Sequence, residues 1–204
     1  MTAPPGPSSD RMRTKVTEPL ETLRYRTAQE LFAALPEIGE DMEARPRRDE
    51  GVMVFARGLL DGAAPEEAVT FAAQMFTRRV SVWWGHECLR HVGDRLDPAD
   101  IEMMERVAAW VADPDEDRRA GLLDAAMASE IRSPGIWLAL GAGWGGASLS
   151  PPDSPPVTPP RFLTGRGVNA AVLAALARVP QPRRQATLHD FLSMARDLAA
   201  PDLD

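Results

Sequence analysis

The sequence of 204 residues has a single cysteine, Cys88, and no long apolar run. One cysteine excludes a disulfide within the chain, and nothing in the sequence requires an oxidising compartment. No segment approaches the roughly 18 consecutive apolar residues of a membrane-spanning helix, and the first residues lack the apolar core of a signal peptide. We therefore expect a cytoplasmic protein with no direct membrane insertion.

Positive charge is scarce relative to negative charge. The chain has 23 Lys and Arg against 30 Asp and Glu, which gives a formal net charge of -7. Nucleic-acid affinity comes mainly from clustered Lys and Arg, so we expect no nucleic-acid partner. The small arginine clusters, such as Arg78 with Arg79, are interpreted as solvated faces. Hydrophobic residues at 44% are typical of a soluble globular protein.

Helix-start patterns recur along the chain. Residues 27–30, TAQE, form a capping box, in which a Thr hydroxyl and a Glu carboxylate accept from free backbone N–H groups. Pro65, Pro98, Pro114 and Pro134 each suit a first helical turn, where no N–H donor is needed. They predict helix starts near residues 65, 98, 114 and 134.

Apolar residues recur at spacings of three and four in most segments between these starts, and no strand pattern is convincing. The sequence predicts an all-α fold, a compact bundle or array of about seven or eight helices. We expect a flexible N-terminal arm over residues 1–18, a single helical domain over residues 19–200 and a C-terminal tail over residues 201–204. A Gly/Pro-rich strap interrupts the helices near residues 141–160.

Residues 141–146, GAGWGG, fit the dinucleotide-binding pattern G-x-G-x-x-G. That pattern requires a strand before it and a helix after it, whereas here a Ser-Pro helix start precedes it and a proline run follows. A phosphate-binding P-loop is excluded because no Gly-Lys-Ser/Thr is present. We expect no cofactor.

The histidine and serine motifs do not complete a catalytic or metal site. His86 and His91 are five residues apart, roughly 140 degrees out of line on a helix, so they do not match the zinc-protease pattern. Cys88 and His91 could share a face, but further ligands are missing, and the simpler interpretation is a buried thiol beside a surface His. Ser148 lacks the frame of a nucleophile elbow, and His189 has no evident partner. We predict no catalytic residue and no metal ligand.

Tryptophan and proline define the candidate interaction surface. Trp83 and Trp84 point about 100 degrees apart on a helix, so one could enter the core while the other reaches its edge. A core position for both is the simpler interpretation. Glycines around Trp144 allow backbone conformations closed to other residues and let its ring lie against a closely approaching element. Residues 151–160 should be extended and either present a rigid surface to a partner or connect two helices, with Thr164 capping the next helix. The candidate interaction residues are Trp84, Trp144, Ser148, Pro151, Pro152, Pro155 and Pro156.

Three segments resemble a bacterial family of unknown function, DUF6931. They are RRVSVWWG at residues 78–85, ADPDEDRRAGLLDAA at residues 112–126, and the Gly/Pro-rich segment with the following FLTGRGVNAAVLAAL. The resemblance spans roughly residues 75–200. The sequence departs from the family pattern at Gly143, Gly145 and Ala147, where an aromatic, Ser and Gly are expected, so a role for Ser at position 145 does not apply.

The resemblance implies no established activity. It does imply association with genes for type VI secretion and forkhead-associated domains, which suits a cytoplasmic accessory. Our leading hypothesis is a non-catalytic protein-interaction or adaptor module whose partner is another protein. Two alternatives remain: an enzyme whose site is assembled in the fold from scattered polar residues such as Glu87, His91 and Ser148, and a self-associating structural subunit that forms a homo-oligomer.

Overall fold

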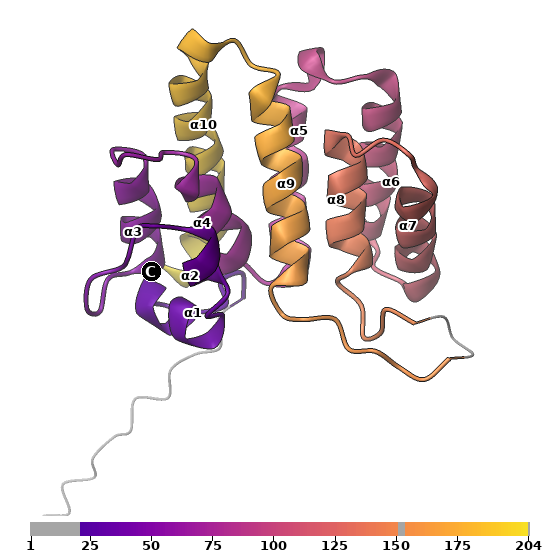
Figure 1. Ribbon diagram of the computed structural model, residues 1–204, viewed down its shortest axis with the longest axis horizontal. Helices are drawn as coiled ribbons and strands as arrows, with labels where there is room; N and C mark the ends of the chain where they lie inside the picture. The colour runs from indigo at the N-terminus through magenta and orange to yellow at the C-terminus, as the bar shows by residue number, and fades with distance from the viewer. Residues whose placement is uncertain (1–20, 151–153, 204) are drawn as a thin grey trace, which may run out of the picture.

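The computed structural model describes residues 21–150 and 154–203 (Figure 1). Within these residues the chain forms ten α-helices and two short 3-10 helices, and no strand. The all-α prediction is confirmed. The helix count exceeds the predicted seven or eight, partly because the N-terminal part contains very short helices whose few residues carry no clear periodicity. The α-helices are α1 (Ala28–Ala34), α2 (Ile38–Asp41), α3 (Val52–Leu59), α4 (Glu67–Met75), α5 (Arg78–His91), α6 (Pro98–Ala112), α7 (Glu116–Ala128), α8 (Pro134–Gly143), α9 (Leu163–Ala177) and α10 (Gln181–Ala199).

Local chemistry marks where several of the helices begin. The predicted capping box is present, with Glu30 N–H donating to the Thr27 hydroxyl at 3.2 Å. Helices α6 and α8 begin at Pro98 and Pro134, as predicted. Helix α7 begins two residues after Pro114, because the carboxylate of Asp115 accepts from the N–H of Arg118 at 2.8 Å and so forms the N-cap.

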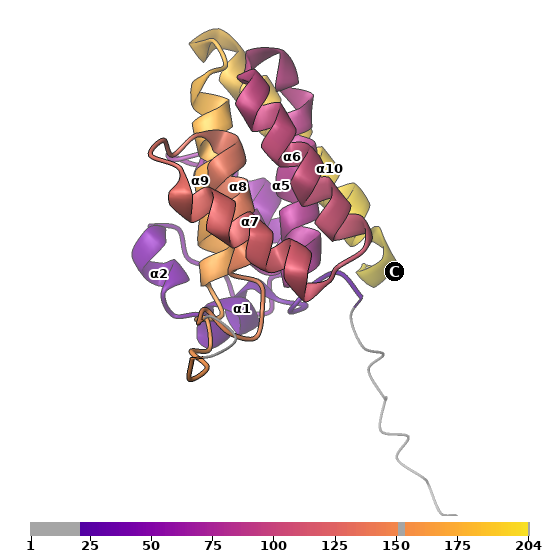
Figure 2. The ribbon, with the colours of Figure 1, turned by 90° about the vertical axis from the view of Figure 1, so that its right-hand side faces the viewer.

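Helices α5 and α9 lie side by side at the centre of the molecule (Figures 1 and 2). On one side, α8 packs against α9, and α6 and α7 cover α8. On the other side, α4 packs against α9 and α5, and α3 and α10 pack against α4. One hydrophobic cluster runs from Leu23 to Ala199 through all of these contacts.

The start of α8 is stabilised by a residue from another helix. Asp100 on α6 is 1% exposed, and its carboxylate accepts from the N–H of Gly135 at 2.8 Å. Arg178, which follows α9, donates to the other oxygen of the same carboxylate at 3.1 Å. Asp100 thus joins the ends of three helices.

The two ends of the described chain meet. Asp202, in the 3-10 helix Ala200–Asp202, accepts hydrogen bonds from the backbone N–H groups of Glu21, Thr22 and Leu23 at 2.7 to 2.8 Å. Within the predicted C-terminal tail over residues 201–204, Asp202 is therefore bonded to the domain. The predicted arm over residues 1–18 lies outside the described residues. None of the helices in the described part of the chain has the length and apolar character needed to cross a membrane.

Candidate functional site

The glycine-rich pattern of residues 141–146 begins inside helix α8. Gly141 and Gly143 lie in the last turns of α8, and residues 144–149, here called the glycine loop, follow. No glycine of the described residues has a positive φ. The expectation that these glycines supply unusual backbone conformations is therefore wrong.

The glycines instead allow close approach. A Cβ on Gly141 would lie 3.2 Å from the Thr164 carbonyl oxygen of α9, and one on Gly143 would lie 2.8 Å from the Leu123 side chain of α7. A Cβ on Gly146 would lie 2.3 Å from Nε of Arg119. The pattern that looks like a cofactor motif is thus explained by packing against three different neighbours.

Arg119 of α7 lies beneath the glycine loop. The residue is only 6% exposed, and its Nη1 donates to the Gly143 carbonyl. Its Nη2 lies 3.5 Å from the Ser148 carbonyl oxygen, and its Nε donates to Glu116 at 2.9 Å. Hydrogen bonding to Glu116 raises the pKa of Arg119 and outweighs its burial. A permanently charged, buried guanidinium therefore bonds to the last residue of α8 and to Ser148 of the glycine loop.

A second arginine contacts the same loop from another helix. Nη1 of Arg78, the first residue of α5, lies 3.3 Å from the Gly145 carbonyl oxygen and 3.4 Å from that of Gly146. Two guanidinium groups thus donate to the carbonyls of Gly143, which ends α8, and of three residues of the glycine loop, Gly145, Gly146 and Ser148. The three sequence segments that carry the family resemblance meet at this point.

The chain beyond the loop returns to it. The Leu149 N–H donates to the Val157 carbonyl at 2.8 Å, and the Ser148 hydroxyl accepts from the N–H groups of Ser150 and Val157 at 3.0 and 3.1 Å. Residues 154–160, here called the proline segment, form neither helix nor strand. The Ser148 hydroxyl thus joins the glycine loop to the proline segment.

The outer part of the proline segment is exposed. Pro155 and Pro156 are exposed, and Val157 is 54% exposed although it is apolar. Pro159 is buried and so fixes the far end of the segment to the domain. The predicted interaction residues Pro151 and Pro152 lie outside the described residues.

The two tryptophans assigned to the candidate surface occupy different environments. Trp144 follows α8 directly and is half-buried, packed against the core. Trp84 is fully buried, and its indole N–H donates to the Phe191 carbonyl at 3.0 Å. Its assignment to an interaction surface is therefore wrong, because its ring fills the core between α5 and α10.

Two buried polar atoms near the start of α9 have no hydrogen-bond partner. They are Oε1 of Gln74 and the Thr164 hydroxyl. The amide nitrogen of Gln74 donates to the Phe162 carbonyl at 2.9 Å. Thr164 lies within α9, whose N-cap residue is Phe162, so the prediction that Thr164 caps this helix is wrong.

The polar residues considered for catalysis do not converge. Cys88 is fully buried, and burial raises its pKa well above its usual value, with the charge of Glu87 adding to the effect. Such a thiol is a poor nucleophile. The His86 ring stacks on Trp83 with ring centroids 5.0 Å apart, whereas His91 lies at the surface, its Nε2 3.1 Å from Asp190.

His189 lines a different hollow, with α3 residues. No group of three His, Cys, Asp or Glu side chains within residues 21–150 and 154–203 is placed to hold a metal ion.

The sequence analysis missed the roles of Arg78 and Arg119. Arg119, Leu122 and Ala126 are all buried and follow one another at spacings of three and four on α7. A charged residue inside such an apolar stripe indicates a buried partner, and this pattern could have identified Arg119. Arg78 is the first residue of α5 and lies in no apolar stripe that could have indicated its role.

Comparison with known proteins identifies one matching family model. The profile described as "Family of unknown function (DUF6931)" matches residues 55–199, which begins earlier than the resemblance inferred from the sequence. No curated protein and no solved structure matches the chain. The matched region contains α5 to α9, both loop-binding arginines and the glycine loop. The chain belongs to the DUF6931 family.

Proposed function

We propose that this protein is a non-catalytic interaction or adaptor module, and that the proline segment forms its docking surface with the glycine loop as a base. The observation that supports this most is that an exposed apolar residue, Val157, lies on a segment whose backbone is bonded to the glycine loop and whose Pro159 is buried. Its backbone bonds to Ser148 and Leu149, and the loop carrying these two residues bonds to Arg78 and Arg119.

This arrangement favours docking for an energetic reason. A partner that orders a flexible segment on binding must offset the lost conformational entropy, whereas a segment that is already fixed loses less. Prolines reduce that loss further because their φ angle is fixed. Exposed Pro155, Pro156 and Val157 therefore offer apolar surface at a small entropic cost.

The narrower hypothesis is that the module is a bacterial cytoplasmic accessory of a secretion system such as type VI. It rests on the genomic association that the family resemblance implies. The identity of a captured partner tests this secretion-system hypothesis.

The test is affinity purification of the tagged protein from its native cells, with mass spectrometry. Wild type is compared with Val157→Asp, and Val54→Asp is the matched control because Val54 is a 65% exposed valine on α3. Circular dichroism verifies that both variants fold. We expect a stoichiometric partner that Val157→Asp loses and Val54→Asp retains.

Retention of that partner by folded Val157→Asp contradicts the assignment of the docking surface. If no partner is found with any form of the protein, the adaptor function itself is contradicted. Light scattering on the purified protein identifies the alternative of a self-associating subunit, since a monomer excludes it.

A further inference from the structure

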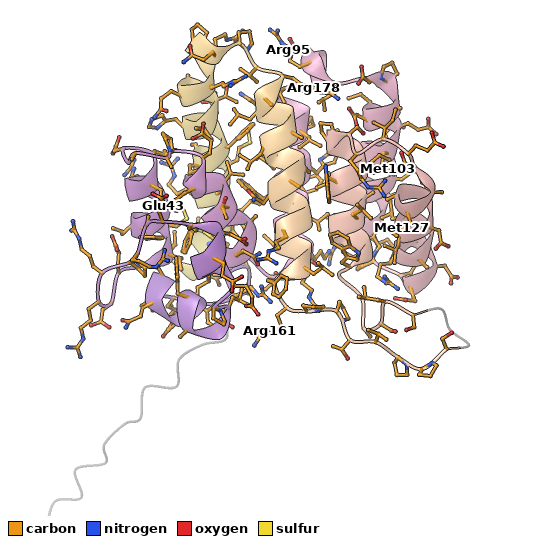
Figure 3. All side chains as sticks on the ribbon, in the orientation of Figure 1. Glu43, Arg95, Met103, Met127, Arg161 and Arg178 are labelled. Atoms are coloured by element: carbon orange, nitrogen blue, oxygen red, sulfur yellow. The ribbon has the colours of Figure 1, made fainter. Side chains whose placement is uncertain are left out.

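An open pocket of about 510 Å³ lies where the N-terminal segment, the start of α5 and the chain before α9 meet. Three of its lining residues are arginines, one from each of these segments: Arg24, Arg78 and Arg161. Leu23 and Thr77 complete the lining. Figure 3 shows Arg161 beside the lower end of α9, on the side facing α1.

Within the described residues, no carboxylate forms an ion pair with any of these three arginines. The ion pairs found in the described part of the chain involve other arginines, for example Arg166 with Asp41 and Arg178 with Asp97. Arg24 donates instead to the neutral carbonyl of Arg161 at 3.2 Å. Three guanidinium groups without an ion pair thus share one pocket of a protein whose net charge is -7.

The electrostatic environment of Arg24 shows that the three charges act on one another. Burial lowers its pKa, Tyr25 opposes this effect, and the positive charges of Arg161 and Arg78 lower the pKa further. The mutual repulsion is a cost that an anion in the pocket would remove.

The donors available in the pocket suit an anion with several oxygens. A guanidinium group carries five N–H donors, of which Arg24 uses one on Nη2 and Arg78 uses Nη1. The Thr77 hydroxyl forms no cap hydrogen bond with α5 and remains available. A carboxylate is matched by a single arginine fork, whereas three guanidinium groups match a group with three oxygens and nearly two negative charges.

We propose that this pocket is a binding site for a phosphate group, either free phosphate or a soluble phosphate monoester. The site does not depend on the docking function, because it uses none of the exposed residues of the proline segment. Arg78 belongs to both features, since it also bonds to the glycine loop, so it is unsuitable for a selective test.

The experiment is a titration of the ¹⁵N-labelled full chain with inorganic phosphate and, separately, with phenyl phosphate, at constant ionic strength set with NaCl. We expect saturable backbone amide shifts concentrated at residues 23–24, 77–78 and 161. Arg161→Gln and Arg24→Gln should each weaken binding about tenfold, as expected for one lost hydrogen bond to a charged group. Tighter binding of phenyl phosphate identifies an ester as the ligand, and tighter binding of inorganic phosphate identifies the free ion.

Two comparisons make the result specific. Arg183→Gln removes an exposed arginine of α10 that lies far from the pocket along the chain, and it should leave phosphate affinity unchanged. Acetate should bind more weakly than phosphate.

The proposal is overturned if the shifts do not saturate, if acetate binds as tightly as phosphate, or if Arg161→Gln binds phosphate like wild type. Arg161 is exposed in a non-helical segment, so its replacement tests the site even if Arg24→Gln fails to fold.

Discussion

At the scale of single residues, Arg119 shows why a buried charge can be stable beneath a loop of glycines. Its guanidinium is removed from water, which is costly unless its donors find acceptors. The carbonyls of Gly143 and Ser148 and the carboxylate of Glu116 supply them. Gly146 leaves the space that the guanidinium occupies, because any Cβ there would overlap it.

Replacement of Arg119 by Gln should therefore destabilise the protein. We expect a loss of about 2 to 4 kcal/mol in the free energy of unfolding, because buried carbonyls lose their charged donor. Arg118→Gln is the matched control, since the neighbouring Arg118 is exposed and its ion pairs with Asp113 and Asp115 lie in solvent. Urea denaturation of both variants gives the comparison. Equal stability of the two would show that the Arg119 contacts contribute nothing.

The residue scale is also where prediction from the sequence succeeded least. Trp84 was expected on an interaction surface, but it lies in the core, where its indole N–H donates to the Phe191 carbonyl of α10. This position depends on a distant segment of the chain. Exposed Pro155 and Pro156 agree with the expected accessibility, because proline position along the chain is itself a local property.

At the scale of elements, the close contact of α8 and α9 positions the glycine loop. Gly141 of α8 faces Gly167 of α9, and an added Cβ on Gly167 would lie 2.7 Å from the Gly141 Cα. Both glycines lie within helices, so this contact cannot relax unless one of the two helices shifts. The end of α8, from which the loop starts, is fixed by this contact.

Gly167→Ala should accordingly cost about 1 to 3 kcal/mol of stability, as overpacking does in cores. Gly58→Ala is the matched control. Gly58 also lies in a helix, but an added Cβ there meets nothing within 4 Å, so alanine should stabilise the protein by up to about 1 kcal/mol through its better helix propensity. Thermal unfolding of the two variants should shift in opposite directions. A shift of Gly167→Ala in the same upward direction as Gly58→Ala would contradict the close contact.

Elements were predicted well where their signals are local. Proline and capping residues fixed the starts of α1, α6 and α8, since these interactions involve neighbours along the chain. Helix α2 was missed because its four residues are too few to show a period. The contribution of Asp100 to the start of α8 was missed for another reason, because the capping group comes from a different helix.

At the scale of the whole molecule, the chain closes on itself through Asp202. Burial of this carboxylate by itself raises its pKa, but hydrogen bonds from the Thr22 hydroxyl and from the backbone of residues 21–23 outweigh burial and lower the pKa to about 2. The segment so bonded carries Leu23 into the core and continues to Arg24 in the arginine pocket. The C-terminal end thereby positions one wall of that pocket.

The lowered pKa gives a pH-dependent prediction. The unfolded carboxyl has a pKa near 3.8, so its contribution to stability is fully present well above that value and is lost as the pH falls towards 2. Asp202→Asn should cost about 1 to 2 kcal/mol at pH 7, and the difference from wild type should shrink between pH 4 and pH 2. Urea denaturation of both proteins between pH 7 and pH 2 measures this difference in the free energy of unfolding.

Asp197→Asn provides the control, since Asp197 is exposed on α10 and pairs only with its neighbour Arg196. A difference between Asp202→Asn and wild type that stays constant down to pH 2 would show that the stabilisation does not depend on the carboxylate charge. Because Asp202 fixes the segment leading to Arg24, Asp202→Asn should also weaken phosphate binding at neutral pH, whereas Asp197→Asn should not. Urea denaturation and phosphate titration of both variants together distinguish loss of the Asp202 hydrogen bonds from a general loss of negative charge.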